Sequence, residues 1–208
     1  SLCITDGILF GSENRIYKYD YKKRSFKSIN IKKQEDIGSD VTKYRVQKII
    51  AFSEREALVA TRRDGVYVLD YQTMRLKRLF SGSSNILQGA YLSSNGYIYL
   101  SFWGQGLFCY EKTGKFIKRY TKENSDLTNN YVLDIVEKEG FLWLATDGGG
   151  INRLELSNEN FSNLYHIAGD KNSFPVNSVT ILYKDENEGL WAGSVRGGVF
   201  NIKESYIR

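Results

Sequence analysis

The residues that could carry out chemistry are few in this 208-residue chain, and they are widely spaced. The only histidine, His166, is predicted to lie in an outer strand beside Tyr165, far from any serine or cysteine motif. Cys3 and Cys109 are too few for a disulfide framework and have no zinc-site spacing, so we interpret them as small buried hydrophobic residues. These observations indicate a segment that is not an enzyme, with no catalytic residues, no metal and no cofactor.

Two further patterns suggest chemistry but have simpler explanations. Asp134 and Asp185 fall near matching places in a repeat, and a carboxylate pair could do acid–base work. The simpler interpretation is that both aspartates are turn residues at the ends of repeats. The glycine runs at 148–150 and 197–198 lack the Lys-Ser/Thr and the strand-to-helix context of a phosphate loop. Hairpin turns explain these runs better.

A short motif that repeats five times sets the positions of all these residues. Its clearest copies are residues 142–151 and 190–199, and weaker copies begin near residues 9, 58 and 98. The aromatic or β-branched anchor of the motif falls at Phe10, Val59, Tyr99, Trp143 and Trp191. Anchors spaced about 40–50 residues apart are typical of a repeat architecture.

Each repeat is predicted to contain four short strands. In the fourth repeat these strands cover residues 132–137, 141–146, 151–156 and 161–166, and glycine, asparagine and aspartate separate them. Four antiparallel strands per repeat form a β-propeller blade. We therefore predict an all-β fold, a β-propeller of about five four-stranded blades. The blades are predicted to cover residues 1–36, 41–83, 84–124, 125–171 and 172–208.

The repeat resembles that of the two-component regulator propeller family. Residues 177–185, Gly189, 190–194 and 197–199 match the family pattern closely, as do residues 130–136, Gly140 and 142–151. The third repeat departs from it at residues 102–105. The closing run 196–206 is similar to the end of a sensor propeller in Bacteroides-type hybrid two-component systems. That resemblance implies a periplasmic ectodomain that detects an oligosaccharide and signals to a cytoplasmic histidine kinase.

The family resemblance also implies that this chain is an incomplete part of a seven-bladed ring. The sequence begins inside an innermost strand at residues 2–5 and stops near the start of an outer strand at residues 205–208. We expect an open arc whose first and last blades present apolar faces. Absent blades, other domains of the parent chain or a second copy in a homodimer would cover these faces. No apolar run approaches 18 residues, so any membrane span would lie outside this segment.

Positive charge is concentrated near the first repeat. Residues 15–48 hold eleven Lys or Arg against four Asp or Glu, and the rest of the chain holds eighteen against twenty. Part of this stretch, residues 30–44, is predicted to be a long surface loop. One interpretation is a solvated outer edge on which lysines discourage strand pairing. The other is a surface for an anionic partner such as nucleic acid or an acidic glycan, and overall we predict no nucleic acid partner.

Loops on a propeller face could hold a ligand. By analogy with WD-repeat propellers, the turns between second and third strands share one face with the connections between blades. A sugar would find there an aromatic surface and forked hydrogen-bonding groups, and arginine suits a uronate or sulfate. The predicted ligand-binding residues are Arg62, Arg63, Trp103, Gln105, Asn130, Asp147 and Arg196. The alternative is that these are ordinary turn residues. Trp143 and Trp191 are assigned to packing between blades.

Two functions from different classes remain open. The first is a sensory propeller that binds an oligosaccharide, which could be acidic. The second is an interaction scaffold without a small ligand, because propellers serve many functions.

Overall fold

The structure is a computed structural model that describes residues 2–4, 7–31, 44–81 and 85–202. These residues form 19 strands and no helix, so the predicted all-β fold is confirmed. Tyrosine, phenylalanine, valine and isoleucine are frequent in the strands, as half-buried pleated surfaces favour. No helix of the described part is long and apolar enough to cross a membrane. The predicted end strand at residues 205–208 and most of the predicted loop 30–44 lie outside the described residues.

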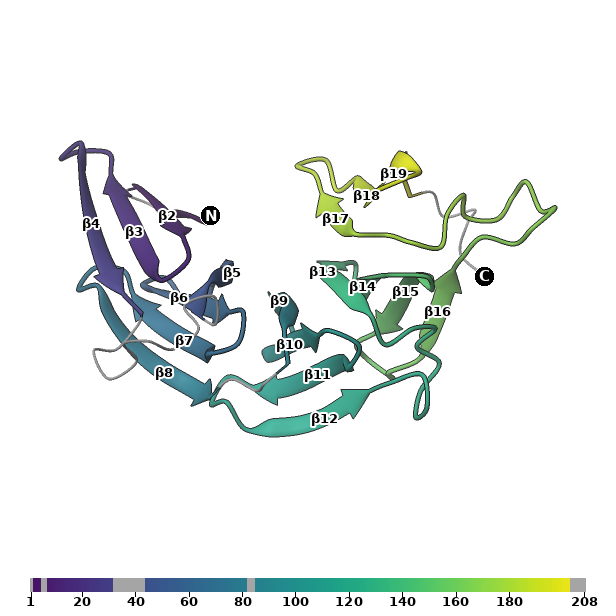
Figure 1. Ribbon diagram of the computed structural model, residues 1–208, viewed down its shortest axis with the longest axis horizontal. Helices are drawn as coiled ribbons and strands as arrows, with labels where there is room; N and C mark the ends of the chain where they lie inside the picture. Colours follow the sequence, from purple (N-terminus) through teal and green to yellow (C-terminus); the bar gives the residue numbers. More distant parts are fainter. Residues whose placement is uncertain (1, 5–6, 32–43, 82–84, 203–208) are drawn as a thin grey trace. The chain divides into compact units, whose positions relative to one another are not determined.

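The strands form five antiparallel sheets, and neighbours in the sequence pair with each other (Figure 1). The first sheet contains β1 (Leu2–Ile4), β2 (Gly7–Gly11), β3 (Arg15–Asp20) and β4 (Ser25–Asn30). The second contains β5 (Val46–Ala51), β6 (Glu56–Thr61), β7 (Gly65–Asp70) and β8 (Arg75–Ser81). The third contains β9 (Leu87–Leu92), β10 (Tyr97–Phe102), β11 (Gly106–Glu111) and β12 (Phe116–Tyr120).

The fourth and fifth sheets hold the clearest copies of the motif. The fourth contains β13 (Val132–Lys138), β14 (Phe141–Thr146), β15 (Gly150–Glu155) and β16 (Phe161–Leu164), close to the predicted strands. The fifth contains β17 (Ile181–Lys184), β18 (Leu190–Ser194) and β19 (Gly198–Asn201). The fold is therefore a run of small propeller-type sheets, four of them four-stranded. The blade boundaries, the closure of the ring and the open arc stay predictions.

The chain divides into two compact units, Ser1–Leu87 and Gln88–Arg208. In the first unit, Leu9 and Ile16 of the first sheet share one core with Ala57, Val59 and other residues of the second sheet. In the second unit, one core is shared by the third and fourth sheets and another by the fourth and fifth sheets. Each core is therefore a layer of side chains between two successive sheets.

The register of the hairpins corrects two predicted anchors. Thr61 and Thr146 each donate a hydrogen bond to the carbonyl of the glycine four residues later, so they hold equivalent positions. Leu58 then occupies the position of Trp143, and Val59 lies one residue too late. Phe10 is displaced in the same way, because Leu9 is the residue in the core shared with the second sheet. A shift of one residue turns a side chain to the opposite face of a strand.

Trp143 and Trp191 are equivalent in register but differ in burial. Trp143 is 6% exposed and lies in the core shared with the fifth sheet. Trp191 is 38% exposed, so the prediction that both indoles are largely buried is wrong for Trp191. Its face of the fifth sheet also carries Ile181, Tyr183 and Val199, all exposed. We call these four residues the outer face of the fifth sheet, and no other described sheet packs on it.

A glycine begins the third strand in four of the five sheets, and at Gly106 and Gly150 a side chain does not fit. A Cβ atom at Gly150 would lie 2.1 Å from the carbonyl oxygen of Leu164, and one at Gly106 would lie 2.2 Å from that of Tyr120. Both glycines also have positive φ angles, of 73° and 77°. These two glycines thus permit close approach of the third and fourth strands of their sheets.

Candidate functional site

Several predicted ligand-binding residues meet at one end of the second unit. The backbone N–H of Gly106 donates to the carbonyl of Asn130 at 2.8 Å, which joins the β10–β11 turn to the segment before β13. The N–H of Asp147 donates to the carbonyl of Tyr131 at 3.0 Å, and the Asn129 amide donates to the Asp147 carbonyl at 2.8 Å. The structure therefore brings together the segments that carry Trp103, Gln105, Asn130 and Asp147.

The centre of this region is an aromatic pair. The ring of Trp103 meets that of Tyr131 edge to face, with centroids 5.1 Å apart and an interplanar angle of 78°. Trp103 is 47% exposed and Tyr131 is 39% exposed, so both rings offer surface to a ligand. Sequence reasoning missed Tyr131, although it directly follows the predicted Asn130. We call Trp103 and Tyr131 the aromatic corner.

The polar residues beside the aromatic corner are held by internal hydrogen bonds. Arg119 of β12 donates to both the backbone carbonyl and the side-chain Oε1 of Gln105, at 2.6 and 3.0 Å. The Asn130 amide donates to the Glu123 carboxylate, and this contact holds the pKa of Glu123 below its usual value. Ser178 donates to Asp147 Oδ1 at 2.6 Å. These contacts fix the orientation of the polar groups, and sequence reasoning did not find Arg119, Glu123 or Ser178.

The remaining predicted residues occupy turns of other sheets. Arg62 and Arg63 lie in the β6–β7 turn of the first unit. Beside them, Arg78 donates to Asp64 at 2.9 Å and to the Tyr67 hydroxyl at 2.6 Å. Burial and the adjacent Asp64 raise the pKa of Tyr67. Arg78 therefore holds the β6–β7 turn by hydrogen bonds, as Arg119 holds the β10–β11 turn. Arg196 is exposed in the β18–β19 turn.

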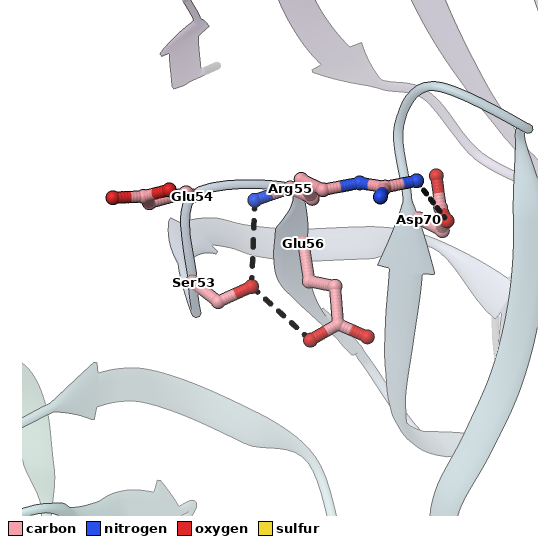
Figure 2. Close-up of a pocket in the computed structure, with 5 residues that line it drawn as sticks. All are labelled: Ser53, Glu54, Arg55, Glu56 and Asp70. Atoms are coloured by element: carbon pink, nitrogen blue, oxygen red, sulfur yellow. Dashed lines mark hydrogen bonds and ion pairs between the residues drawn. The ribbon is translucent and has the colours of Figure 1, made fainter.

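Two of the hollows among the described residues lie elsewhere. Figure 2 shows an open recess of about 530 Å³ around the β5–β6 turn, where Arg55 pairs with Asp70 at 3.7 Å and Ser53 donates to Glu56. All five residues that line it are polar or charged, and no aromatic side chain is among them. A smaller cavity of about 110 Å³ in the second unit is lined by Asn95, Tyr97, Tyr99, Cys109, Ile117, Lys118, Tyr120, Leu154, Glu155, Leu156 and Glu159.

The carboxylates and the histidine that the sequence singled out have structural contacts. Asp134 lies within β13, opposite Ala145, where it corresponds to Ile181 and not to Asp185. The prediction of matching turn residues is therefore wrong for Asp134, whereas Asp185 lies in the β17–β18 turn and accepts two backbone N–H groups there. His166 follows β16 and does not belong to it, because its N–H donates to the Asn177 side chain.

In the glycine run at 148–150, the backbone N–H groups of Gly148 and Gly150 already donate hydrogen bonds within the protein, so they are not open to a phosphate. Gly148 and Gly150 both donate their N–H groups to the carbonyl of Asn177, at 3.0 and 2.7 Å. In the described part of the chain, no group of three or more His, Cys, Asp or Glu side chains is placed to hold a metal ion. The glycine run is thus a hairpin turn that also ties the fourth sheet to the segment before the fifth.

Comparison with known proteins finds similar solved structures but no similar family model or curated sequence. No protein-family model matches the chain, and no curated protein sequence is similar to it. The fold is similar to a crystal structure named as the extracellular domain of the hybrid two-component system BT3049 from B. thetaiotaomicron, with a TM-score of 0.73 and 19% identity. The match covers 96% of this chain and 27% of that one.

Two further solved structures are similar. The extracellular domain of BT4673 from the same organism matches with a TM-score of 0.71 and 19% identity, over 96% of this chain and 28% of that one. A computationally designed protein, Ika8, matches with a TM-score of 0.63 and 13% identity, over 95% of this chain and 55% of that one. The chain thus spans about a quarter of the two sensor ectodomains, and at this identity the likeness shows the fold.

Proposed function

We propose that this chain is a ligand-binding part of the extracellular region of a two-component sensor, and that the ligand is an oligosaccharide. The similarity of nearly the whole chain to two extracellular sensor domains supports the class of protein. The aromatic corner carries the proposal of a ligand, because it places two exposed rings beside fixed polar groups. Signal would pass from the bound ectodomain to a cytoplasmic histidine kinase.

The aromatic corner suits a sugar for two physical reasons. An exposed indole and phenol meeting edge to face present an apolar surface against which the C–H face of a sugar ring can pack. Asp147 is exposed beside Tyr131. Its carboxylate can accept hydrogen bonds that sugar hydroxyls donate. Arg119 already donates a hydrogen bond to the side chain of Gln105. The Gln105 side chain therefore orients the β10–β11 turn more than it binds a ligand.

Calorimetric titration of the intact chain with neutral and acidic oligosaccharides tests this proposal. Trp103→Ala and Tyr131→Ala should each weaken binding of the best oligosaccharide by about tenfold or more, since loss of a buried aromatic contact costs about 1–3 kcal/mol. Tyr97→Ala is the control, because Tyr97 is 37% exposed and begins β10, the strand whose opposite end precedes Trp103. Binding unchanged in both variants, or no binding to any oligosaccharide, would rule out a sugar site here.

A second candidate function is a scaffold that docks another β-sheet. The outer face of the fifth sheet supports it, because Ile181, Tyr183, Trp191 and Val199 form an exposed apolar surface. Contiguous apolar surface of this kind commonly marks an interface. Light scattering of the chain and of a Tyr183→Lys/Val199→Lys variant distinguishes the outcomes. Self-association lost in the variant supports the scaffold, and a monomer at all concentrations argues against association between copies.

A further inference from the structure

The whole net charge of the chain resides in one hairpin. Residues 15–31, which contain β3 and β4, hold six Lys or Arg and one Asp. The rest of the chain holds 23 basic and 23 acidic residues, so the chain's net charge of +5 equals that of this hairpin. We call Lys22, Lys23, Arg24 and Lys27 the basic hairpin. Such concentration at one place produces a local positive field that a neutral remainder does not oppose.

The basic hairpin is exposed, and Asp20 is the one acidic residue in residues 15–31. All four side chains belong to exposed residues, and within the described residues none of them forms an ion pair with a carboxylate. Lys27 also lies directly across from Lys18 in the β3–β4 register, and like charges placed opposite each other destabilise a sheet. Lys18 is buried and donates to the carbonyl of Tyr71. Lys27 of the basic hairpin therefore faces a second lysine across the hairpin.

The second sheet has the same turn without the charges at its tip. Asp20 Oδ1 accepts the N–H groups of Lys22 and Lys23 at 3.0 and 2.9 Å, and Arg24 has a φ of 48°. In the second sheet, Asp70 Oδ1 accepts the N–H groups two and three residues later, both at 2.9 Å. The next residue there again has a positive φ, of 58°. The three tip residues of that turn are Gln72, Thr73 and Met74.

The conformation of the β3–β4 turn does not depend on the positive charges at its tip. The backbone conformation needs the aspartate, whose pKa is lowered in both sheets chiefly by a backbone N–H of the turn. It does not need lysine or arginine at the tip, because Gln72, Thr73 and Met74 support the same geometry. The chain thus holds three cations on a rigid turn at which neutral residues would fold equally well.

We propose that the basic hairpin is a binding surface for a linear glycan that carries sulfate or carboxylate groups. Arg24 can meet two oxygens of one such group, and the lysines act as point charges for neighbouring groups along the chain. The tip and the edge strand β4 are both exposed, so an extended polyanion can lie along them. The choice of a glycan over a nucleic acid rests on the proposed extracellular location. This site is separate from the aromatic corner and does not require it.

The test replaces the three tip residues of the β3–β4 turn by those of the equivalent β7–β8 turn. Lys22→Gln, Lys23→Thr and Arg24→Met together give the first sheet the tip sequence of the second. Binding of heparin and of polygalacturonate to the intact chain is measured against salt concentration, with dextran as the neutral probe. The triple variant should bind both acidic glycans at least about tenfold more weakly than the parent chain. The negative slope of log binding constant against log salt concentration should become shallower by about 2–3, because about one counterion is released for each cation.

A charge-matched control distinguishes this site from net charge alone. Lys112→Gln, Lys122→Gln and Lys171→Gln remove the same charge from exposed positions of the second unit and should leave binding nearly unchanged. Conversely, Gln72→Lys, Thr73→Lys and Met74→Arg should strengthen binding. Equal losses in the triple variant and in the control would overturn the proposal. Tighter binding to single-stranded DNA or to phosphatidylglycerol vesicles than to either acidic glycan would overturn the choice of partner. Trp103→Ala should not alter any of these results.

Discussion

The carboxylate of Asp134 crosses from the fourth sheet to the fifth, where its Oδ2 accepts the backbone N–H of Leu182 at 3.1 Å. Asp134 is 5% exposed and Leu182 is 4% exposed, so this contact is closed to water. It lies where the register of β13 shifts between Val132 and Asp134. One side chain thus links the innermost strands of two successive sheets.

Replacing Asp134 by Ala should destabilise the second unit by about 1–3 kcal/mol. The substitution leaves the buried Leu182 N–H without this acceptor, and an unsatisfied buried donor costs an amount in that range. Urea unfolding followed by tryptophan fluorescence measures the change. Asp126→Ala removes a carboxylate from an exposed position and should change stability little. Equal midpoints for both variants would contradict the prediction.

The two equivalent tryptophans should differ in their contribution to stability. Trp143→Ala should cost about 3–5 kcal/mol, because it removes a large side chain from a closed core. Trp191→Ala should cost about 1 kcal/mol, since its ring is partly exposed and it loses mainly the hydrogen bond from its Nε1 to Asp185. Thermal unfolding monitored by far-ultraviolet circular dichroism compares them. The prediction fails if Trp191→Ala is the more damaging change.

Glycine at the start of β15 should be required, whereas glycine in the β13–β14 turn should be replaceable at a smaller cost. Gly150→Ala combines a positive φ with a clash against the Leu164 carbonyl, and should destabilise by more than about 2 kcal/mol. Gly140→Ala has a φ of 77° but nothing within 4 Å of the added Cβ, so only the backbone cost of about 1–2 kcal/mol applies. A matched pair of denaturant curves measures the difference, and equal costs would refute the role of the close approach.

Burial raises the pKa of the Cys109 thiol above its usual value of 9.0. The folded state therefore holds the proton more tightly, and the stabilisation is complete below the unfolded pKa and lost as pH rises through the folded pKa. In a Cys3→Ser background, Cys109 should react with iodoacetamide at least about tenfold more slowly at pH 8 than after unfolding in urea. Raising the pH above about 9 should lower stability more in this protein than in its Cys109→Ala variant. Equal alkylation rates before and after unfolding would contradict the burial of the thiol.

The sequence by itself determined the repeat and the type of element. The spacing of the copies at residues 142–151 and 190–199 predicted small antiparallel sheets, because strand alternation and turn glycines are local properties. It did not determine which face each anchor takes, since Val59 and Leu58 are both apolar and only the hairpin register separates them. The glycines of the motif could be recognised as turn residues, but the close approach of Gly106 and Gly150 to the fourth strands of their sheets could not.

Tertiary structure alone decided which residues of the candidate site act together. Trp103 and Asn130 could be selected as residue types, whereas the contact of Trp103 with Tyr131 and the bracing of Gln105 by Arg119 join segments 14 or more residues apart. Burial likewise depends on neighbours: Trp143 and Trp191 share one sequence context, and only the sheet packed on Trp143 makes their environments differ. Local sequence sets the direction in which a side chain points along its strand, and long-range packing decides what it meets there.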